Sequence, residues 1–193
     1  MLAGSDGVVN QQLQKLKDLL PGLTAKCGES IVITIDGPAG SGKTTLAKEL
    51  SSSLDSYYTI HMDDLYEGWD STLTSKLTAK LKTILSCVQN ENRINFLPFD
   101  WVESRFASEV DLPATKYLII EGVGSGQIAI RDFASLSLWI EVSPDLGLER
   151  VIKRDGPSVA DFMPAFIVAQ SAHFEKEDTK KSADYRLSGH GTV

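Results

Sequence analysis

Short strand-forming runs alternate along the chain with segments whose apolar residues recur at helical spacing. The runs cover residues 31–35, 57–62, 116–120, 136–142 and 185–187 and are rich in β-branched and aromatic residues. Amphipathic stripes cover residues 9–20 and 73–88, and two further helices are expected from Pro144 and at 165–176. Strands that alternate with helices predict an α/β fold built on a mostly parallel, five-stranded sheet.

The first run leads into a glycine-rich turn, Gly37-x-x-x-x-Gly42-Lys43-Thr44, which has the full Walker A spacing. Glycines let backbone N–H groups surround an anion, the lysine reaches the β- and γ-phosphates, and the Thr44 hydroxyl suits Mg²⁺. A helix predicted directly after the loop adds a favourable dipole for phosphate. The residues expected to bind the phosphates of ATP are Gly37, Ala39, Gly40, Ser41, Gly42, Lys43, Thr44 and Thr45.

Carboxylates follow two of the predicted strands. Asp63 and Asp64 come directly after residues 57–62, and Glu121 follows residues 116–120. In open α/β sheets the carboxyl ends of the strands line the ligand crevice, so these acids are expected to face the phosphates. Glu121 then has the position of a Walker B acid that holds Mg²⁺ directly or through water. The alternative for the Asp63-Asp64 pair is a helix cap or a solvated loop.

Aromatic residues surround an acid at Phe99-Asp100-Trp101, just after Pro98, which is expected to stop regular structure. These rings could be core, or they could line an acceptor pocket in which Asp100 binds hydroxyl groups. A basic cluster of Arg150, Lys153 and Arg154 stands near the end of a predicted helix. These cations could stabilise the C-terminal end of the helix dipole. Alternatively, they could form a lid, near residues 150–160, that neutralises the charge of a transferring phosphoryl group.

Composition narrows the class of partner. The net charge of −7 and the pI near 5.0 argue against nucleic-acid binding, and no apolar run is long enough to cross a membrane. Cys27 and Cys87 lie far apart, as in a protein with reduced thiols, so the cytoplasm is the expected location. His173 and His190 are expected at the surface.

The Walker A motif, Met62-Asp63-Asp64-Leu65-Tyr66, Phe99-Asp100-Trp101 and Ile120-Glu121-Gly122, in this order, resemble the uridine kinase-like branch of the P-loop kinases. The resemblance covers about residues 31–187. It implies a P-loop NTPase three-layer sandwich and an ATP-dependent phosphotransferase that uses Mg²⁺ and a small-molecule hydroxyl acceptor.

The resemblance also implies roles for individual residues. Asp63 would take the proton of the acceptor hydroxyl, and Lys43, Arg150 and Arg154 would stabilise the transferred charge. The Mg²⁺ site would comprise Thr44, Glu121 and Asp63, and the acceptor site would comprise Tyr66, Phe99, Asp100 and Trp101.

Residues 1–193 are expected to form one kinase-like domain, with an amphipathic helix and lead-in at residues 1–28. That helix is expected to pack on the core, and association into a homodimer is left open. Because the lid has few basic residues, the alternative function is a non-catalytic, nucleotide-binding regulatory protein.

Overall fold

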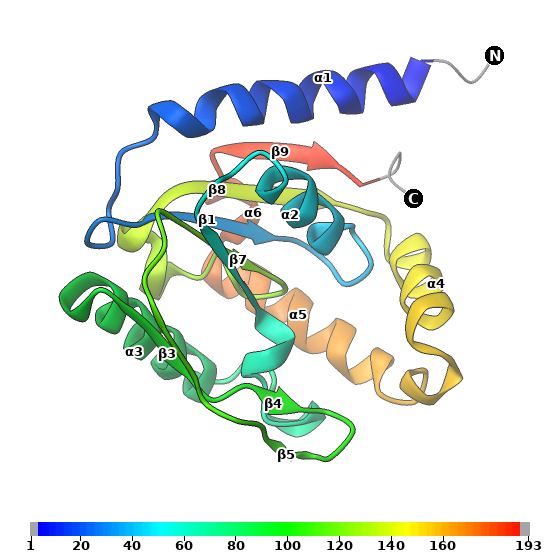
Figure 1. Ribbon diagram of the computed structural model, residues 1–193. Helices are drawn as coiled ribbons and strands as arrows, with labels where there is room; N and C mark the ends of the chain where they lie inside the picture. The colour runs from blue at the N-terminus through cyan, green and yellow to red at the C-terminus, as the bar shows by residue number, and fades with distance from the viewer. Residues whose placement is uncertain (1–3, 190–193) are drawn as a thin grey trace.

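A computed structural model describes residues 4–189 of the chain and contains a central sheet of five parallel strands (Figure 1). The strands are β1 (Ile31–Asp36), β2 (Tyr57–His61), β7 (Tyr117–Glu121), β8 (Ala134–Glu141) and β9 (Tyr185–Ser188), in the order β2-β7-β1-β8-β9. All four strand pairs are parallel. The predicted α/β fold is therefore confirmed, and each of the five expected strand runs corresponds to one strand.

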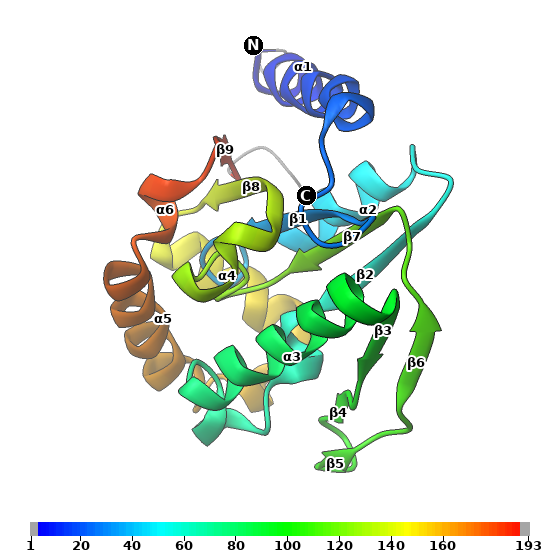
Figure 2. The same cartoon turned by 90° about the vertical axis from the view of Figure 1, so that its left-hand side faces the viewer.

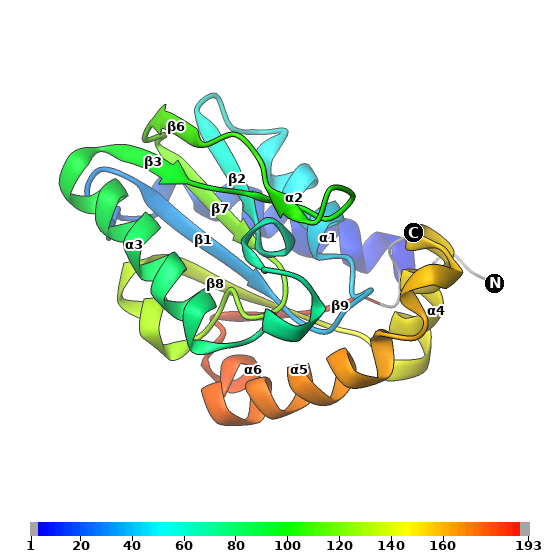
Figure 3. The same cartoon turned by 90° about the horizontal axis from the view of Figure 1, so that it is seen from below.

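Both faces of the sheet are covered by helices, so successive strand residues enter two different cores (Figures 1 and 3). Ile31, Ile33 and Ile35 pack with Ala47 and Leu50 of α2 (Lys43–Ser51), whereas Val32 packs in the core on the opposite face. This burial on both faces explains why the central strands read as continuous apolar runs.

The N-terminal helix α1 (Gly4–Leu19) lies on the α2 face, where Leu16 is almost completely buried (Figure 2). Leu13, Leu16 and Leu20 of the predicted stripe therefore pack on the core, whereas the side chain of Val9 lies outside the described part of the chain. The opposite face is covered mainly by α3 (Ser75–Glu91) and α5 (Met163–Glu177), together with Val151 of α4 (Pro144–Asp155).

Two small antiparallel pairs lie outside the main sheet. Strand β3 (Arg93–Phe96) pairs with β6 (Val110–Pro113), and β4 (Phe99–Asp100) pairs with β5 (Arg105–Phe106). Pro98 separates β3 from β4, so it ends one strand, but regular structure resumes at the next residue. The expectation that regular structure stops at Pro98 was correct only for β3.

Short segments complete the fold. They are the 3-10 turns η1 (Leu20–Gly22), η2 (Met62–Leu65), η3 (Trp69–Ser71), η4 (Ile128–Phe133) and η5 (Pro157–Val159), and helix α6 (Thr179–Ser182). Within residues 4–189, no helix has the length and apolarity to cross a bilayer. Cys27 and Cys87 are both free thiols.

The surface assignment of His173 was wrong. The ring is half-buried, and its Nε2 atom is enclosed without a hydrogen-bond partner. Burial is also the main cause that lowers the pKa of His173. His190 lies outside the described residues.

Candidate active site

The glycine-rich loop lies between β1 and α2, with its backbone pressed against other parts of the chain. Gly37 and Gly40 both have positive φ, and a Cβ atom on either would come within 2.2 Å of a carbonyl oxygen, of Ile140 and Gly147 respectively. Neither position can accept another residue without movement of the backbone. Gly42 occupies the N-cap of α2 without a side chain, which leaves the N–H groups of the first helical turn free to bind an anion.

Lys43 is buried and folds back over its own loop. Its Nζ atom donates hydrogen bonds to the carbonyl oxygens of Gly37 (2.8 Å) and Pro38 (2.7 Å) and lies 3.5 Å from Ser41 Oγ. Burial lowers the pKa of Lys43, whereas the negative charges of Glu121, Asp36 and Asp63 oppose that change. The lysine cation is thus held where phosphate groups would enter the loop.

Asp36, which the sequence reasoning missed, anchors the loop from below. Its carboxylate accepts hydrogen bonds from the backbone N–H groups of Gly37 (2.7 Å), Gly124 (3.0 Å) and Gly126 (2.9 Å). Burial raises the pKa of Asp36 to about 6, although these bonds and Lys43 oppose the rise. An acid at the end of a fully buried, mostly apolar strand was the available signal in the sequence.

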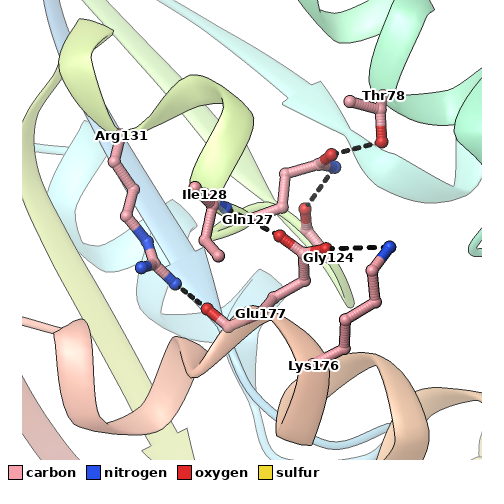
Figure 4. A network of polar contacts seen from close by, with 7 residues as sticks. All are labelled: Thr78, Gly124, Gln127, Ile128, Arg131, Lys176 and Glu177. Carbon is pink, nitrogen blue, oxygen red and sulfur yellow. Dashed lines mark hydrogen bonds and ion pairs between the residues drawn. The ribbon is translucent and has the colours of Figure 1, made fainter.

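A second network fixes the loop that follows β7 (Figure 4). Gln127 Nε2 donates to the carbonyl oxygen of Gly124 (3.0 Å), and Thr78 Oγ1 of α3 donates to Gln127 Oε1 (2.5 Å). Glu177 Oε2 of α5 accepts the Ile128 N–H (2.9 Å). Side chains of α3 and α5 therefore hold the loop whose glycine N–H groups bind Asp36.

Glu121, at the end of β7, connects the glycine-rich loop with β2. Its Oε1 atom accepts hydrogen bonds from Thr44 Oγ1 (2.9 Å) and from His61 Nδ1 (2.5 Å). Burial alone would raise the pKa of Glu121, but the hydrogen bonds from His61 and Thr44 and the charge of Lys43 lower it below its usual value. Glu121 is therefore ionised at neutral pH.

Asp63 lies in η2, directly after β2, and remains exposed to solvent. Desolvation by the surrounding protein, and then the negative charge of Glu121, raise the pKa of Asp63. The positive charges of Lys43 and Arg154 oppose this rise. The main cause that raises the pKa of Arg154 is its hydrogen bonding to Asp155, with smaller contributions from Asp63 and Glu121. These mutual influences show that Asp63, Glu121, Lys43 and Arg154 lie in one electrostatic environment.

The four residues expected at the acceptor site have different surroundings. Trp101 Nε1 donates to the carbonyl oxygen of Asp63 (2.9 Å), and Phe99 contacts the Trp101 ring edge-on. Asp100 Oδ1 accepts the N–H groups of Val102 and Glu103 within the β4–β5 turn. Tyr66 is buried, and its hydroxyl donates to the carbonyl oxygen of Val123 (2.7 Å).

Trp69 and Phe162 join this aromatic group, although the sequence reasoning did not select them. Their rings stack with centroids 5.0 Å apart and planes 3° apart, and Trp69 also meets Trp101 at 5.2 Å. The three residues come from the η3 segment, from the residue before α5 and from the turn after β4. Only the folded chain brings them together, so no local pattern could have identified the group.

Arg150 and Arg154 point to different places. Arg150 Nη1 donates to the carbonyl oxygens of Gly189 (2.7 Å) and Gly40 (3.3 Å), so it ties the glycine-rich loop to the end of β9. Gln170, another residue that the sequence reasoning missed, accepts the Ala39 N–H (3.1 Å) from α5. Arg154 is the residue of this pair whose charge acts on Asp63.

The donor set fits Mg²⁺ together with phosphate. Thr44 supplies a hydroxyl and Glu121 an ionised carboxylate, and both are hard oxygen donors. Within the described part of the chain, no three His, Cys, Asp or Glu residues form a metal-binding group by themselves. Mg²⁺ is usually bound by one or two carboxylates together with waters and phosphate oxygens.

Comparisons with known proteins agree with this geometry. The uridine kinase of Borrelia hermsii is 24% identical over 180 residues, covering 79% of this chain and 84% of its own. Uridine-cytidine kinase C of Dictyostelium discoideum is 30% identical over 139 residues, which cover 66% of this chain and 30% of that protein. A possible uridine kinase from Bacillus stearothermophilus has the same fold, with a TM-score of 0.67, 20% identity and coverage of 92% and 98% of the two chains.

Residues 33–162 match the model of the AAA domain family, and this segment contains the glycine-rich loop, Asp63, Glu121, Arg150 and Arg154. The predicted resemblance to uridine kinase-like P-loop kinases is confirmed by these relatives, and the chain belongs to the AAA domain family.

Proposed function

We propose that this protein is an ATP-dependent small-molecule kinase, acting as one domain, that transfers the γ-phosphoryl group to a hydroxyl of a nucleoside-like or other small metabolite. The observation that carries the proposal is the convergence of Lys43, Thr44 and Glu121 with Asp63. Glu121 accepts the Thr44 hydroxyl, and the charges of Lys43, Glu121 and Arg154 all act on Asp63. The uridine kinase relatives support the phosphotransferase class.

In the proposed reaction, the acceptor oxygen forms a bond to the γ-phosphorus while the bond from that phosphorus to the β,γ-bridging oxygen breaks and releases ADP. Asp63 takes the hydroxyl proton, a role that suits a carboxylate whose pKa is raised. Lys43 and Arg154 stabilise the negative charge on the transferring group, where electrostatic complementarity contributes most of the rate. Mg²⁺ at Thr44 and Glu121 would neutralise phosphate charge.

The test is a screen for ADP release over nucleosides, vitamins and sugars, with the wild type beside Asp63→Asn and Lys43→Ala. With the true acceptor, we expect turnover to fall about 10²- to 10⁴-fold in Asp63→Asn, because the proton acceptor is lost. Lys43→Ala should lower it about 10²- to 10³-fold, because a cation is lost beside the developing charge.

Asp64→Asn is the matched control. Its neighbour Asp63 is subject to the charges of Lys43 and Arg154, whereas the charges acting on Asp64 come from His61 and Glu121. We therefore expect Asp64→Asn to retain far more activity than Asp63→Asn. If no acceptor raises ADP release above the level of Asp63→Asn, the kinase proposal fails.

The alternative, a nucleotide-binding regulatory protein without phosphoryl transfer, is favoured by one observation. Trp69 contacts both Trp101 and Phe162, and Trp101 donates to the carbonyl oxygen of Asp63, so part of this aromatic surface is already used in packing. Calorimetry would then show ATP binding to the wild type, and none of the candidate acceptors would bind.

A further inference from the structure

The segment that carries Asp63 is held at both of its ends by the loop that follows β7. Before Asp63, Met62 packs so closely on Gly122 that a Cβ atom on the glycine would lie 2.5 Å from the Met62 Cβ. After Asp63, the Tyr66 hydroxyl donates to the carbonyl oxygen of Val123 (2.7 Å). The position of Asp63 therefore depends on where this loop lies.

That loop, residues 122–126, is in turn tied to the glycine-rich loop by Asp36. Asp36 is only 2% exposed, and its carboxylate accepts N–H groups from both loops. One of these groups belongs to Gly37, and the other two belong to Gly124 and Gly126. A continuous series of contacts therefore runs from the backbone of the glycine-rich loop, through the loop after β7, to η2.

The Tyr66 hydroxyl is committed to this series of contacts. Tyr66 is only 2% exposed, and its single hydroxyl proton is donated to Val123. Burial raises the pKa of Tyr66 well above its usual range, and the negative charges of Asp63 and Asp36 add to the rise. The hydroxyl therefore stays protonated at neutral pH and continues to donate to the carbonyl oxygen of Val123.

We propose that Tyr66 is a positioning residue for phosphoryl transfer, which holds Asp63 in a fixed place relative to the glycine-rich loop without touching the acceptor. Transfer requires the reacting groups to meet in a narrow range of geometry, and a displacement of about 1 Å can cost about 10²-fold in rate. The inference rests on the proposed function, in which Asp63 takes the proton of the acceptor hydroxyl. It gives Tyr66 a role other than the direct acceptor binding that the family resemblance implies.

The experiment is a double-mutant cycle of Tyr66→Phe with Asp63→Asn, measured by steady-state ADP release with the acceptor that the screen identifies. Tyr66→Phe removes one hydroxyl and keeps the buried ring. We expect kcat to fall about 10- to 100-fold, while the KM for ATP and the KM for the acceptor stay within about twofold. In the Asp63→Asn protein no proton acceptor is left to position, so adding Tyr66→Phe should lower kcat by less than about twofold.

Tyr117→Phe is the matched control. Tyr117 is also buried, and its hydroxyl also donates to a backbone carbonyl oxygen, that of Leu20 (3.4 Å). Tyr117 begins β7, however, whereas Glu121 ends it. Tyr117→Phe should therefore lower stability to urea and leave kcat within about twofold. If it lowers kcat as much as Tyr66→Phe does, the loss of any buried tyrosine hydroxyl slows the reaction, and the positioning role of Tyr66 is overturned.

The other outcomes separate the positioning role from the proposed function. A rise in the acceptor KM with an unchanged kcat would show that Tyr66 binds the acceptor. Fully additive losses in the Asp63→Asn/Tyr66→Phe protein would show that Tyr66 acts independently of Asp63. Either result overturns the positioning role while the kinase activity stands. If the wild type turns over no acceptor, the proposed function fails and the positioning role fails with it.

Discussion

At the scale of single residues, two hydrogen bonds fix the orientation of the Glu121 carboxylate. Thr44 and His61 donate to the same oxygen, Oε1, so the carboxylate is held in one orientation. A carboxylate only accepts hydrogen bonds, so His61 carries its proton on Nδ1. We therefore infer that His61 would position Glu121 if that carboxylate holds Mg²⁺.

We predict that His61→Ala weakens the Mg²⁺ dependence of ATP binding. Loss of the hydrogen bond frees Glu121, and partners of metal ligands are worth about 10- to 100-fold in metal affinity. The measurement is ATP affinity by calorimetry at increasing Mg²⁺ concentration. ATP binding without Mg²⁺ should stay unchanged, and His61→Asn, which retains a donor, should recover much of the loss. Equal Mg²⁺ dependence in His61→Ala and wild type would show that His61 has no such role.

At the scale of secondary-structure elements, α4 and α5 hold the glycine-rich loop. The backbone of α4 comes so close that a Cβ atom on Gly147 would lie 2.6 Å from the carbonyl oxygen of Ala39. Gln170 of α5 accepts the Ala39 N–H, and Arg150 of α4 donates to Gly40. Arg150 of α4 therefore supports the loop, while the charge of Arg154 acts on Asp63.

Helix α5 also carries a pH-dependent contribution to stability. Burial lowers the pKa of His173 below its ordinary value of 6.5, and the charge of Glu177 partly opposes this change. As the pH falls below 6.5, the unfolded chain therefore takes up a proton that the folded chain excludes. The free energy of unfolding must then decrease toward acid pH.

We predict that His173→Gln reduces this acid-side loss of stability, by up to about 1.4 kcal/mol per pH unit. The measurement is urea denaturation of both proteins at about pH 7.5 and about pH 5.5. Because other groups titrate in both proteins, the difference between them isolates His173. Identical pH dependence would contradict the prediction.

At the scale of the whole molecule, the aromatic group brings together three distant segments of the chain. Trp69 contacts both Phe162 and Trp101. Since Phe162 follows α4 and η5, this packing connects the segment before α5 with the β4–β5 hairpin.

We predict that Trp69→Ala destabilises the protein by about 1–3 kcal/mol, because at least two ring contacts disappear. If the aromatic group lines the acceptor site, the KM for the acceptor also rises about tenfold, whereas the KM for ATP does not change. Trp69→Phe, the control, should restore most of both properties. Denaturation and steady-state kinetics measure them, and an equal rise in both KM values would argue against acceptor binding here.

Much of the fold and of the local geometry of the glycine-rich loop followed from short stretches of sequence. The Walker A loop is local, because its glycines and Lys43 act through backbone within a few residues. Periodicity was sufficient for the five strands of the main sheet and the helices that cover it, but not for the short strands β3 to β6. The positions of Asp63 and Glu121 followed from the rule that parallel strands end at one edge of the sheet.

Other features were decided only by the tertiary structure. Gln170 contacts Ala39 across 131 positions, and Trp69 meets Phe162 from another segment of the chain, so no local pattern could pair them. The chain pattern likewise could not show that Arg150 binds backbone carbonyls while Arg154 acts on Asp63. The sequence of a short segment specifies its local conformation. Contacts between distant segments depend instead on how the layers of the fold pack, and this packing brings α1 beside the glycine-rich loop.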